Sequence, residues 1–265
     1  MEANIAFPAA LIGDPTRAAI LMALMDGSAQ PASALAYVAN VTPQSASNHL
    51  AKLMEGGMLA VEIQGRHRYY RLASPEIATV LEALANLAPC THHLRQPLTP
   101  KGRTLRFARS CYDHLAGQLG VAIVDALEAR GLMSKGDPTT KCYDLSEAGR
   151  TWFSALGIDP DLKRRGRPLQ ALCCLDWTER RHHLGGTLGT VFFERICALG
   201  WLERNRQTRA VHLTALGLAA LDDLLDLDCR ALQASPAPDA GQLANRIAPS
   251  IAASSTREPA VLVID

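Results

Sequence analysis

The segment from Thr42 to Leu59 constrains the fold of this chain more than any other. Thr42 is a suitable helix N-cap, Pro43 fits the first helical position, and Gly56-Gly57 predicts the helix end. Apolar residues recur at helical spacing and predict a buried face made of Ala46, Leu50, Leu53 and Met54. The opposite face carries hydrogen-bonding side chains without a carboxylate among them, namely Gln44, Ser45, Ser47, Asn48, His49 and Lys52. That face suits base edges and phosphates.

The flanking residues predict a helix-turn-helix followed by a two-stranded wing. Residues 31–39 favour a short helix, and Asn40-Val41 favours a tight turn into the next helix. Residues 58–64 and 67–72 alternate like strands around a turn at Gly65-Arg66. Basic side chains gather at or near the wing tip, namely Arg66, His67, Arg68 and Arg71. This combination favours a DNA-reading unit over a small α/β core with an incidental hairpin.

Residues 7–88 resemble the winged helix-turn-helix domain of the ArsR/SmtB family of bacterial transcriptional repressors. Four motifs carry the resemblance, in order: Ile12-Gly-Asp-Pro-Thr-Arg-Ala-Ala-Ile-Leu-Met-Ala-Leu, Gln44-Ser-Ala-Ser-Asn-His-Leu-Ala-Lys-Leu, Gly57-Met-Leu and Gly65-Arg-His-Arg-Tyr-Tyr-Arg-Leu. The resemblance implies contacts to double-stranded DNA through Thr42, the polar helix face and the basic wing residues. It also implies a homodimer on an inverted-repeat operator.

Two apolar segments suit the dimer contacts that the resemblance implies. Residues 3–12 are apolar with little charge, and packing onto their own domain is an equal alternative. One helix begins at Asp14-Pro15 and runs to about Met25. Another apolar helix begins after Ser74, behind the wing. Its stripe comprises Ile77, Val80, Leu81, Leu84 and Leu87. In the resembling family this last helix packs against its symmetry mate.

Bulk properties fit a globular chain of two domains. The 265 residues are 48% hydrophobic and 20% charged, with a net charge of +1, so basic contacts to DNA must be clustered. No apolar run reaches the roughly 18 residues of a membrane span, and no signal peptide opens the chain, which predicts a cytoplasmic protein without a membrane partner. Seven cysteines, an odd count, favour reduced thiols over a disulfide scaffold.

The remaining chain predicts a linker, a duplicated region and a tail. Prolines and a glycine interrupt residues 89–104, which we assign as a linker between the DNA-binding and dimerisation domain (1–88) and an effector-sensing domain (105–233). Within the latter, residues 105–155 and 174–232 repeat a helix, a hairpin and a capped second helix, a winged-helix-like order. Residues 234–265 are rich in Ala, Pro and Ser and favour disorder. The predicted fold class is mainly α with small β-wings (α+β).

Cysteine and histidine residues are the candidate sensors. Two metal sites that the resembling family uses are absent, because residues 33–39 have no cysteine and residues 74–88 have no histidine. What remains is Cys90 with His92 and His93, Cys111 with His114, and Cys173-Cys174 with His182-His183. Thiolate and imidazole suit zinc, copper or an arsenical, but each cluster alone has too few ligands. The predicted sensing residues are Cys111, Tyr112, Asp113, His114, Cys174, Asp176, Trp177, Arg180, His182 and His183.

Other uses of these residues stay open. An organic effector would bind in a cavity between the two Gly-rich helix starts, lined by residues such as Arg109 and Tyr112. A thiol switch would use Cys173-Cys174, whose pKa nearby Arg180 and Arg181 would lower. In a purely structural interpretation, Asp113 and Asp176 cap the following helices.

We therefore predict a DNA-binding transcriptional regulator, a repressor that a metal ion, a small molecule or a thiol-reactive signal releases from DNA. No cofactor is certain from the sequence, and the metal is unknown. Nothing in the sequence matches a phosphate loop, a His-Glu-x-x-His motif or a nucleophile elbow, so we expect no enzyme. The alternatives are an architectural or protein-interaction DNA-binding module without an effector, and a cysteine-dependent enzyme.

Overall fold

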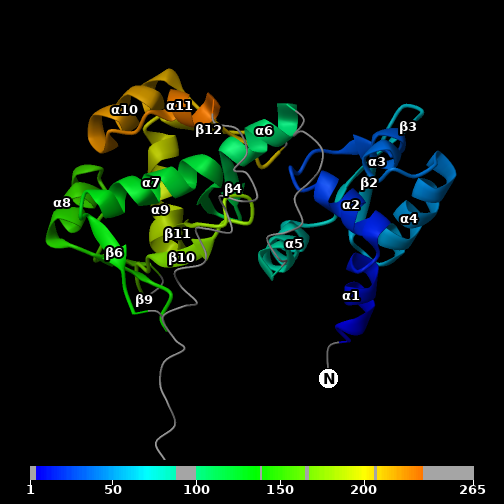
Figure 1. Ribbon diagram of the computed structural model, residues 1–265, viewed down its shortest axis with the longest axis horizontal. Helices are drawn as coiled ribbons and strands as arrows, with labels where there is room; N and C mark the ends of the chain where they lie inside the picture. Colours follow the sequence, from blue (N-terminus) through cyan, green and yellow to red (C-terminus); the bar gives the residue numbers. More distant parts are fainter. Residues whose placement is uncertain (1–3, 88–99, 138, 165–166, 206–207, 235–265) are drawn as a thin grey trace, which may run out of the picture.

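The computed structural model describes residues 4–87, 100–137, 139–164, 167–205 and 208–234. They form a winged-helix part (residues 4–87) and a C-terminal part (residues 100–234), with helix α5 between them (Figure 1). The predicted disorder of residues 235–265 lies outside the described residues, as does the motif at Cys90. None of the helices in the described part combines the length and apolar character that a bilayer span requires.

The winged-helix part has the predicted order of elements. Its helices are α1 (Ala6–Ile12), α2 (Pro15–Ala23), α3 (Ala32–Val38), α4 (Pro43–Glu55) and α5 (Pro75–Leu87). Strands β2 (Leu59–Gln64) and β3 (His67–Leu72) form the antiparallel wing. A third strand that the sequence analysis missed, β1 (Gln30–Pro31), pairs with β3 and gives the sheet order β1-β3-β2.

The local signals for these helices are confirmed. Asp14 accepts a hydrogen bond from the Arg17 backbone at the start of α2, and Thr42 accepts one from the Ser45 backbone at the start of α4. On α4, Ala46, Leu50 and Leu53 are buried as predicted. Met54 is 38% exposed, so its assignment to the buried face was wrong. It lies one position past Leu53 and therefore about 100° around the helix.

The apolar stripe of α5 is divided between two surfaces. Ala78, Leu81 and the charged Glu82 are buried, whereas Val80, Leu84 and Leu87 are exposed. The same is true of the N-terminal segment, in which Leu11 is buried and Ile5 and Phe7 are exposed.

The C-terminal part consists of two units with the same order of elements. The first comprises β4 (Arg109–Cys111), β5 (His114–Ala116), α7 (Gly117–Ala129), β6 (Met133–Lys135), β7 (Tyr143–Leu145) and α8 (Glu147–Ala155). The second comprises β10 (Leu172–Leu175), β11 (His182–Gly185), α9 (Gly186–Ala198), β12 (Leu202–Arg204), β13 (Val211–Leu213) and α10 (Ala215–Leu225). Strands β8 (Lys163–Arg164) and β9 (Arg167–Pro168) lie between them, and α11 (Cys229–Ala234) follows. Both units contribute to one hydrophobic core.

Three details of the C-terminal part differ from the sequence analysis. Helix α6 (Pro100–Phe107) occupies part of the predicted linker, because a proline is compatible with the first turn of a helix. Each unit opens with a hairpin that was missed, β4–β5 and β10–β11, since both are only three or four residues per strand. Residue 234 was assigned to the tail but ends α11.

Hydrogen bonds join the two parts of the chain around α5. The Asn86 side chain donates to the Leu175 carbonyl over 3.0 Å, and the Arg180 guanidinium donates to the Ala85 carbonyl over 3.1 Å. Trp177 packs against the apolar core of the winged-helix part. The loop between β10 and β11 therefore holds the C-terminal end of α5.

Candidate metal centre and DNA-reading surface

Helix α4 presents most of its predicted polar face to solvent. Gln44, Ser47, Asn48 and Lys52 are exposed, and Ser45 is half-buried. His49 differs, because its Nδ1 lies 3.5 Å from the Asp14 carboxylate and only 20% of its side chain is exposed. His49 is thus directed toward the N-terminus of α2.

The wing register separates the basic residues into two groups. Arg66, His67 and Arg68 are exposed, with His67 opposite Gln64 beside the Gly65 turn. Arg71 lies opposite Ala60 at the base of the wing, and its Nε is 2.6 Å from a Glu62 carboxylate oxygen. The expectation that Arg71 lies near the wing tip was therefore wrong, because its strand position is four residues beyond His67.

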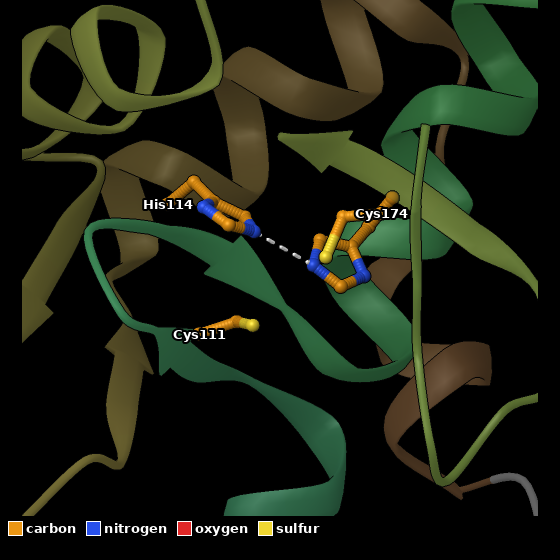
Figure 2. Close-up of side chains that lie close together, drawn as sticks. Cys111, His114 and Cys174 are labelled. Atoms are coloured by element: carbon orange, nitrogen blue, oxygen red, sulfur yellow. Dashed lines mark hydrogen bonds between the residues drawn. The ribbon is translucent and has the colours of Figure 1, made fainter. Parts of the chain in front are cut away.

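Four predicted sensing residues converge between the two hairpins that open the repeated units. Cys111 and His114 face each other across β4–β5, and Cys174 and His183 face each other across β10–β11. One ligand atom from each of the four lies within 4.8 Å of all the others. Figure 2 shows the labelled Cys111, His114 and Cys174 side chains directed toward a common point. Each hairpin thus supplies one sulfur and one imidazole.

The geometry fits a tetrahedral metal ion. The Nε2 atoms of His114 and His183 are 3.0 Å apart (Figure 2), so one nitrogen donates a proton to the other in the absence of an ion. Zn–N bonds of about 2.0 Å and Zn–S bonds of about 2.3 Å place the ligands of a tetrahedral site about 3.3–3.8 Å apart. Small movements of these side chains reach that spacing. Two thiolates and two imidazoles fill four positions and leave none open for a substrate water.

The Cys-x-Asp sequence that recurs in the two units places a carboxylate behind each histidine. Asp113 Oδ1 lies 3.3 Å from His114 Nδ1, and Asp176 Oδ2 lies 3.7 Å from His183 Nδ1. A carboxylate at Nδ1 favours the tautomer whose Nε2 lone pair is free to bind a metal. The interpretation of these aspartates as caps of the following helices was wrong, because α7 and α9 begin without a side-chain cap. Asp176 instead accepts a hydrogen bond from the Gly117 backbone of α7, a helix of the other unit.

The two cysteines of the cluster share a hydrogen bond that separates their pKa values. That bond and burial raise the pKa of Cys111 to about 12, and the same bond lowers the pKa of Cys174. Burial by itself would lower the pKa of His114, but contacts with Cys111 and Asp113 outweigh it and raise that pKa. The lowered pKa favours a thiolate at Cys174, the form in which cysteine binds a metal.

Asp176 also anchors the cluster through a buried ion pair. Its Oδ2 accepts a hydrogen bond of 2.8 Å from Arg109, whose side chain is 1% exposed. Burial by itself would raise the pKa of Asp176, but Arg109, His183 and hydrogen bonds from Thr178 and Gly117 hold it well below its usual range. Asp176 is thus ionised and fixed in place behind His183.

The other predicted sensing residues lie outside the cluster. Tyr112 is 67% exposed in the β4–β5 turn, while Trp177 and Arg180 contact the winged-helix part. His182 alternates with His183 along β11 and thus faces away from it. We expected Arg180 and Arg181 to lower a thiol pKa at Cys173-Cys174, and this was wrong in its cause. The contact with Cys111 lowers the pKa of Cys174, burial raises that of Cys173, and Arg181 pairs with Asp125.

The cavity expected for an organic effector is not present among the described residues at this position. A void of about 10 Å³ separates the two glycine-containing helix starts, far below the size of a ligand pocket. Glycine is needed at both helix starts because a Cβ on Gly189 would lie 2.3 Å from the Leu184 carbonyl oxygen, and one on Gly120 would lie 2.7 Å from the Leu115 carbonyl oxygen. The close approach therefore packs each helix start against the hairpin of its own unit.

A further residue at the cluster was missed by the sequence analysis. Glu82 of α5 is 6% exposed, and its Oε2 lies 3.2 Å from Cys111 Sγ. Its Oε1 lies 2.6 Å from the Arg209 guanidinium and 3.8 Å from Arg109 Nε. The only signal in the sequence was its spacing, four residues after Ala78 on the buried side of α5.

Comparisons with known proteins agree with this architecture. Residues 12–62 match the family model described as a helix-turn-helix domain. The chain is 42% identical over 227 residues to the HTH-type transcriptional regulator YdfF of Bacillus subtilis (strain 168), covering 86% of this chain and 99% of that protein. It is 36% identical over 76 residues to the HTH-type transcriptional regulator CmtR of Mycobacterium bovis, covering 29% of this chain and 64% of that protein.

A solved structure is similar to about a third of the chain. The NMR structure of the cadmium metal-sensor CmtR from Mycobacterium tuberculosis is 30% identical, covers 36% of this chain and 99% of that chain, and superposes with a TM-score of 0.29. The match to YdfF, by contrast, spans nearly the whole length of the relative. The chain belongs to the ArsR/SmtB family of winged helix-turn-helix transcriptional regulators.

Proposed function

We propose that this regulator senses a soft or borderline divalent metal ion, with zinc or cadmium as its ligand, through Cys111, His114, Cys174 and His183. The observation that supports the proposal is the convergence of these four side chains, each histidine backed by the aspartate of its own hairpin. Among the proteins similar to this chain, CmtR is named as a cadmium sensor. That similarity covers 36% of this chain, so the cluster itself carries the proposal.

We assign DNA binding to the winged-helix part and sensing to the C-terminal part. Helix α4 would enter the major groove with Gln44, Ser47 and Asn48 at base edges. Arg66 and Arg68 of the wing would contact phosphates and set the register on the duplex. His49 and Arg71 take a smaller part, because each is already engaged by a carboxylate.

The active form in this proposal is a homodimer on an inverted repeat. The exposed apolar residues of α5 and of the N-terminal segment support it, since several large apolar side chains left exposed on one helix favour a protein contact. They are Val80 (49%), Leu84 (44%), Leu87 (81%), Ile5 (76%) and Phe7 (56%). Two-fold symmetry would place two recognition helices about one DNA turn apart.

Metal-dependent DNA affinity tests the proposal. A duplex that the protein itself selects from a random-sequence pool serves as the probe, and its Kd is measured in chelator and in Zn²⁺ or Cd²⁺. We expect one ion per chain and a DNA Kd at least about fivefold weaker with metal, the lower end of typical coupling.

Two serine variants separate the site from general thiol effects. Cys174→Ser should lose the metal response, whereas Cys173→Ser should keep it, because Cys173 is adjacent in sequence but outside the cluster. A DNA affinity that metal leaves unchanged in the wild type would contradict sensing and favour an architectural module. A response lost equally in both variants would contradict the assignment of the site.

A further inference from the structure

We infer that Glu82 transmits the state of the metal site to the DNA-binding part of the chain, because the Glu82 carboxylate and a metal ion compete for the Cys111 sulfur. This inference rests on the proposed function and names the residue that couples its two sites. Glu82 belongs to α5 of the winged-helix part, whereas Cys111 belongs to the first hairpin of the C-terminal part. Their contact therefore crosses between the two parts.

The contact at Cys111 is a hydrogen bond with the thiol as donor. Cys111 Sγ lies 3.2 Å from Glu82 Oε2, and Glu82 is 6% exposed, so water cannot readily replace the thiol. The single proton on Cys111 faces this carboxylate on one side and the Cys174 sulfur on the other. Loss of that proton therefore removes the donor of the contact with α5.

Arg209 connects the other oxygen of Glu82 to both parts of the chain. Its guanidinium lies 2.6 Å from Glu82 Oε1 and donates to the Ser110 carbonyl over 3.0 Å and to the Met25 carbonyl over 3.3 Å. Its backbone N–H donates to the Asp26 carbonyl over 2.7 Å. Glu82 thus lies at the junction of α5, the segment after α2 and strand β4.

Metal binding and the Glu82 contact exclude each other at the sulfur. A cysteine coordinates a metal as the thiolate, so Cys111 cannot bind the ion and donate its proton to Glu82 at the same time. After coordination, a buried carboxylate faces a sulfur that carries negative charge and no longer donates. A buried carboxylate oxygen without a hydrogen-bond donor is unfavourable, so Oε2 turns from the sulfur toward Arg109, whose Nε lies 3.8 Å from Oε1, and α5 moves with it.

A shift of α5 reaches the DNA-reading surface through direct connections. Helix α5 follows wing strand β3 in the chain, and Ala78 and Leu81 pack in the core that also contains Leu50 and Leu53 of α4. The same helix carries the exposed Val80, Leu84 and Leu87. Movement of α5 therefore changes the placement of the wing and of the surface proposed for the dimer.

Replacing Glu82 with glutamine tests this coupling in the full-length chain. Glutamine keeps the side-chain length, and its amide donates to a thiolate, so both states of Cys111 find a partner. We measure zinc stoichiometry, and the DNA Kd with and without Zn²⁺, on the selected duplex. Glu82→Gln should bind one zinc per chain while its zinc-dependent change in DNA Kd falls at least about fivefold below that of the wild type.

Glu179→Gln is the matched control. Glu179 is also a nearly buried carboxylate paired with an arginine, Arg106, at 2.8 Å, but it does not contact Cys111. This variant should keep the wild-type zinc response. A full zinc response in Glu82→Gln would refute the coupling alone. Wild-type protein that binds neither Zn²⁺ nor Cd²⁺ would refute the proposed function, and the inference with it.

Hydrogen exchange of the wild type provides a test that needs no variant. Zinc should increase amide exchange in residues 75–87, since α5 loses one of its contacts with the C-terminal part. Residues 147–155 of α8, remote from the contact, serve as the internal reference. Zinc binding that leaves exchange in α5 unchanged would overturn the inference even if Glu82→Gln failed to fold.

Discussion

Replacing Asp176 with asparagine removes the charge behind His183 while keeping the size of the side chain. Both Asp176 oxygens act as acceptors: Oδ2 for Arg109 and the Gly117 backbone, at 2.8 and 2.7 Å, and Oδ1 for Thr178 and the Glu179 backbone. An amide offers one oxygen and one donor group. In either orientation of the asparagine amide, its NH₂ group faces hydrogen-bond donors and cannot pair with them.

The structure gives the size of the effect. Arg109 is 1% exposed and the Asp176 side chain is fully buried, so the variant removes the nearer of the two carboxylates that face a buried guanidinium, and Glu82 at 3.8 Å is the other. Breaking a buried ion pair by changing one partner costs about 3–5 kcal/mol. For a part of the chain of this size, that corresponds to a decrease in Tm of roughly 10–20 °C.

Urea unfolding of the metal-free protein, followed by tryptophan fluorescence, measures this cost. The control is Asp161→Asn, which removes the exposed pair with Arg150 (side chains 76% and 43% exposed) and should cost less than about 1 kcal/mol. The Asp176 contribution is present above the unfolded pKa of about 3.9 and is lost as pH falls below it, because the folded pKa is lower. A cost for Asp176→Asn no larger than that of the control would refute the reasoning.

Three further predictions concern DNA and the repeats. Arg68→Ala should weaken binding to all sequences and reduce the salt slope by about 1, as measured by DNA titrations at several salt concentrations; an unchanged slope would contradict a phosphate contact. Gln44→Ala should reduce discrimination between base pairs by about 1–3 kcal/mol in competition assays, and a uniform loss of affinity would contradict base reading. Gly149→Ala should lower the free energy of unfolding by roughly 1–3 kcal/mol in urea titrations, because its Cβ would lie 1.8 Å from the Leu132 carbonyl oxygen. Ser154→Ala on the same helix should change it by less than about 0.5 kcal/mol, and equal effects of the two variants would contradict the clash.

Local signals explain why much of the winged-helix part was predictable. Thr42 and Pro43 determine where α4 begins, and the apolar spacing within that helix determines which face is buried. These effects act over three or four residues, so the sequence displays them directly. The assignment failed for Met54, because its exposure depends on how wide a face of α4 the rest of the domain covers. It failed for Arg71, because its place depends on the pairing register of the wing strands.

The candidate metal site was predictable only as a set of residue types. Cysteine, histidine and the repeated Cys-x-Asp sequence were visible, but their convergence depends on the packing of two hairpins from separate parts of the chain. The second hairpin has eight residues between its cysteine and histidine, whereas the first has two, which hid their equivalence. Glu82 was not predictable at all, because its contact with Cys111 depends on how the two parts of the chain dock.

X-ray absorption spectroscopy of the zinc-loaded protein tests the central claim most directly, since it reports the elements bound to the ion. A site made of Cys111, His114, Cys174 and His183 predicts two sulfur ligands at about 2.3 Å and two nitrogen ligands at about 2.0 Å. Cys174→Ser should lose one of the sulfurs. A first shell of oxygen and nitrogen only, or a sulfur count that Cys174→Ser leaves unchanged, would contradict the account.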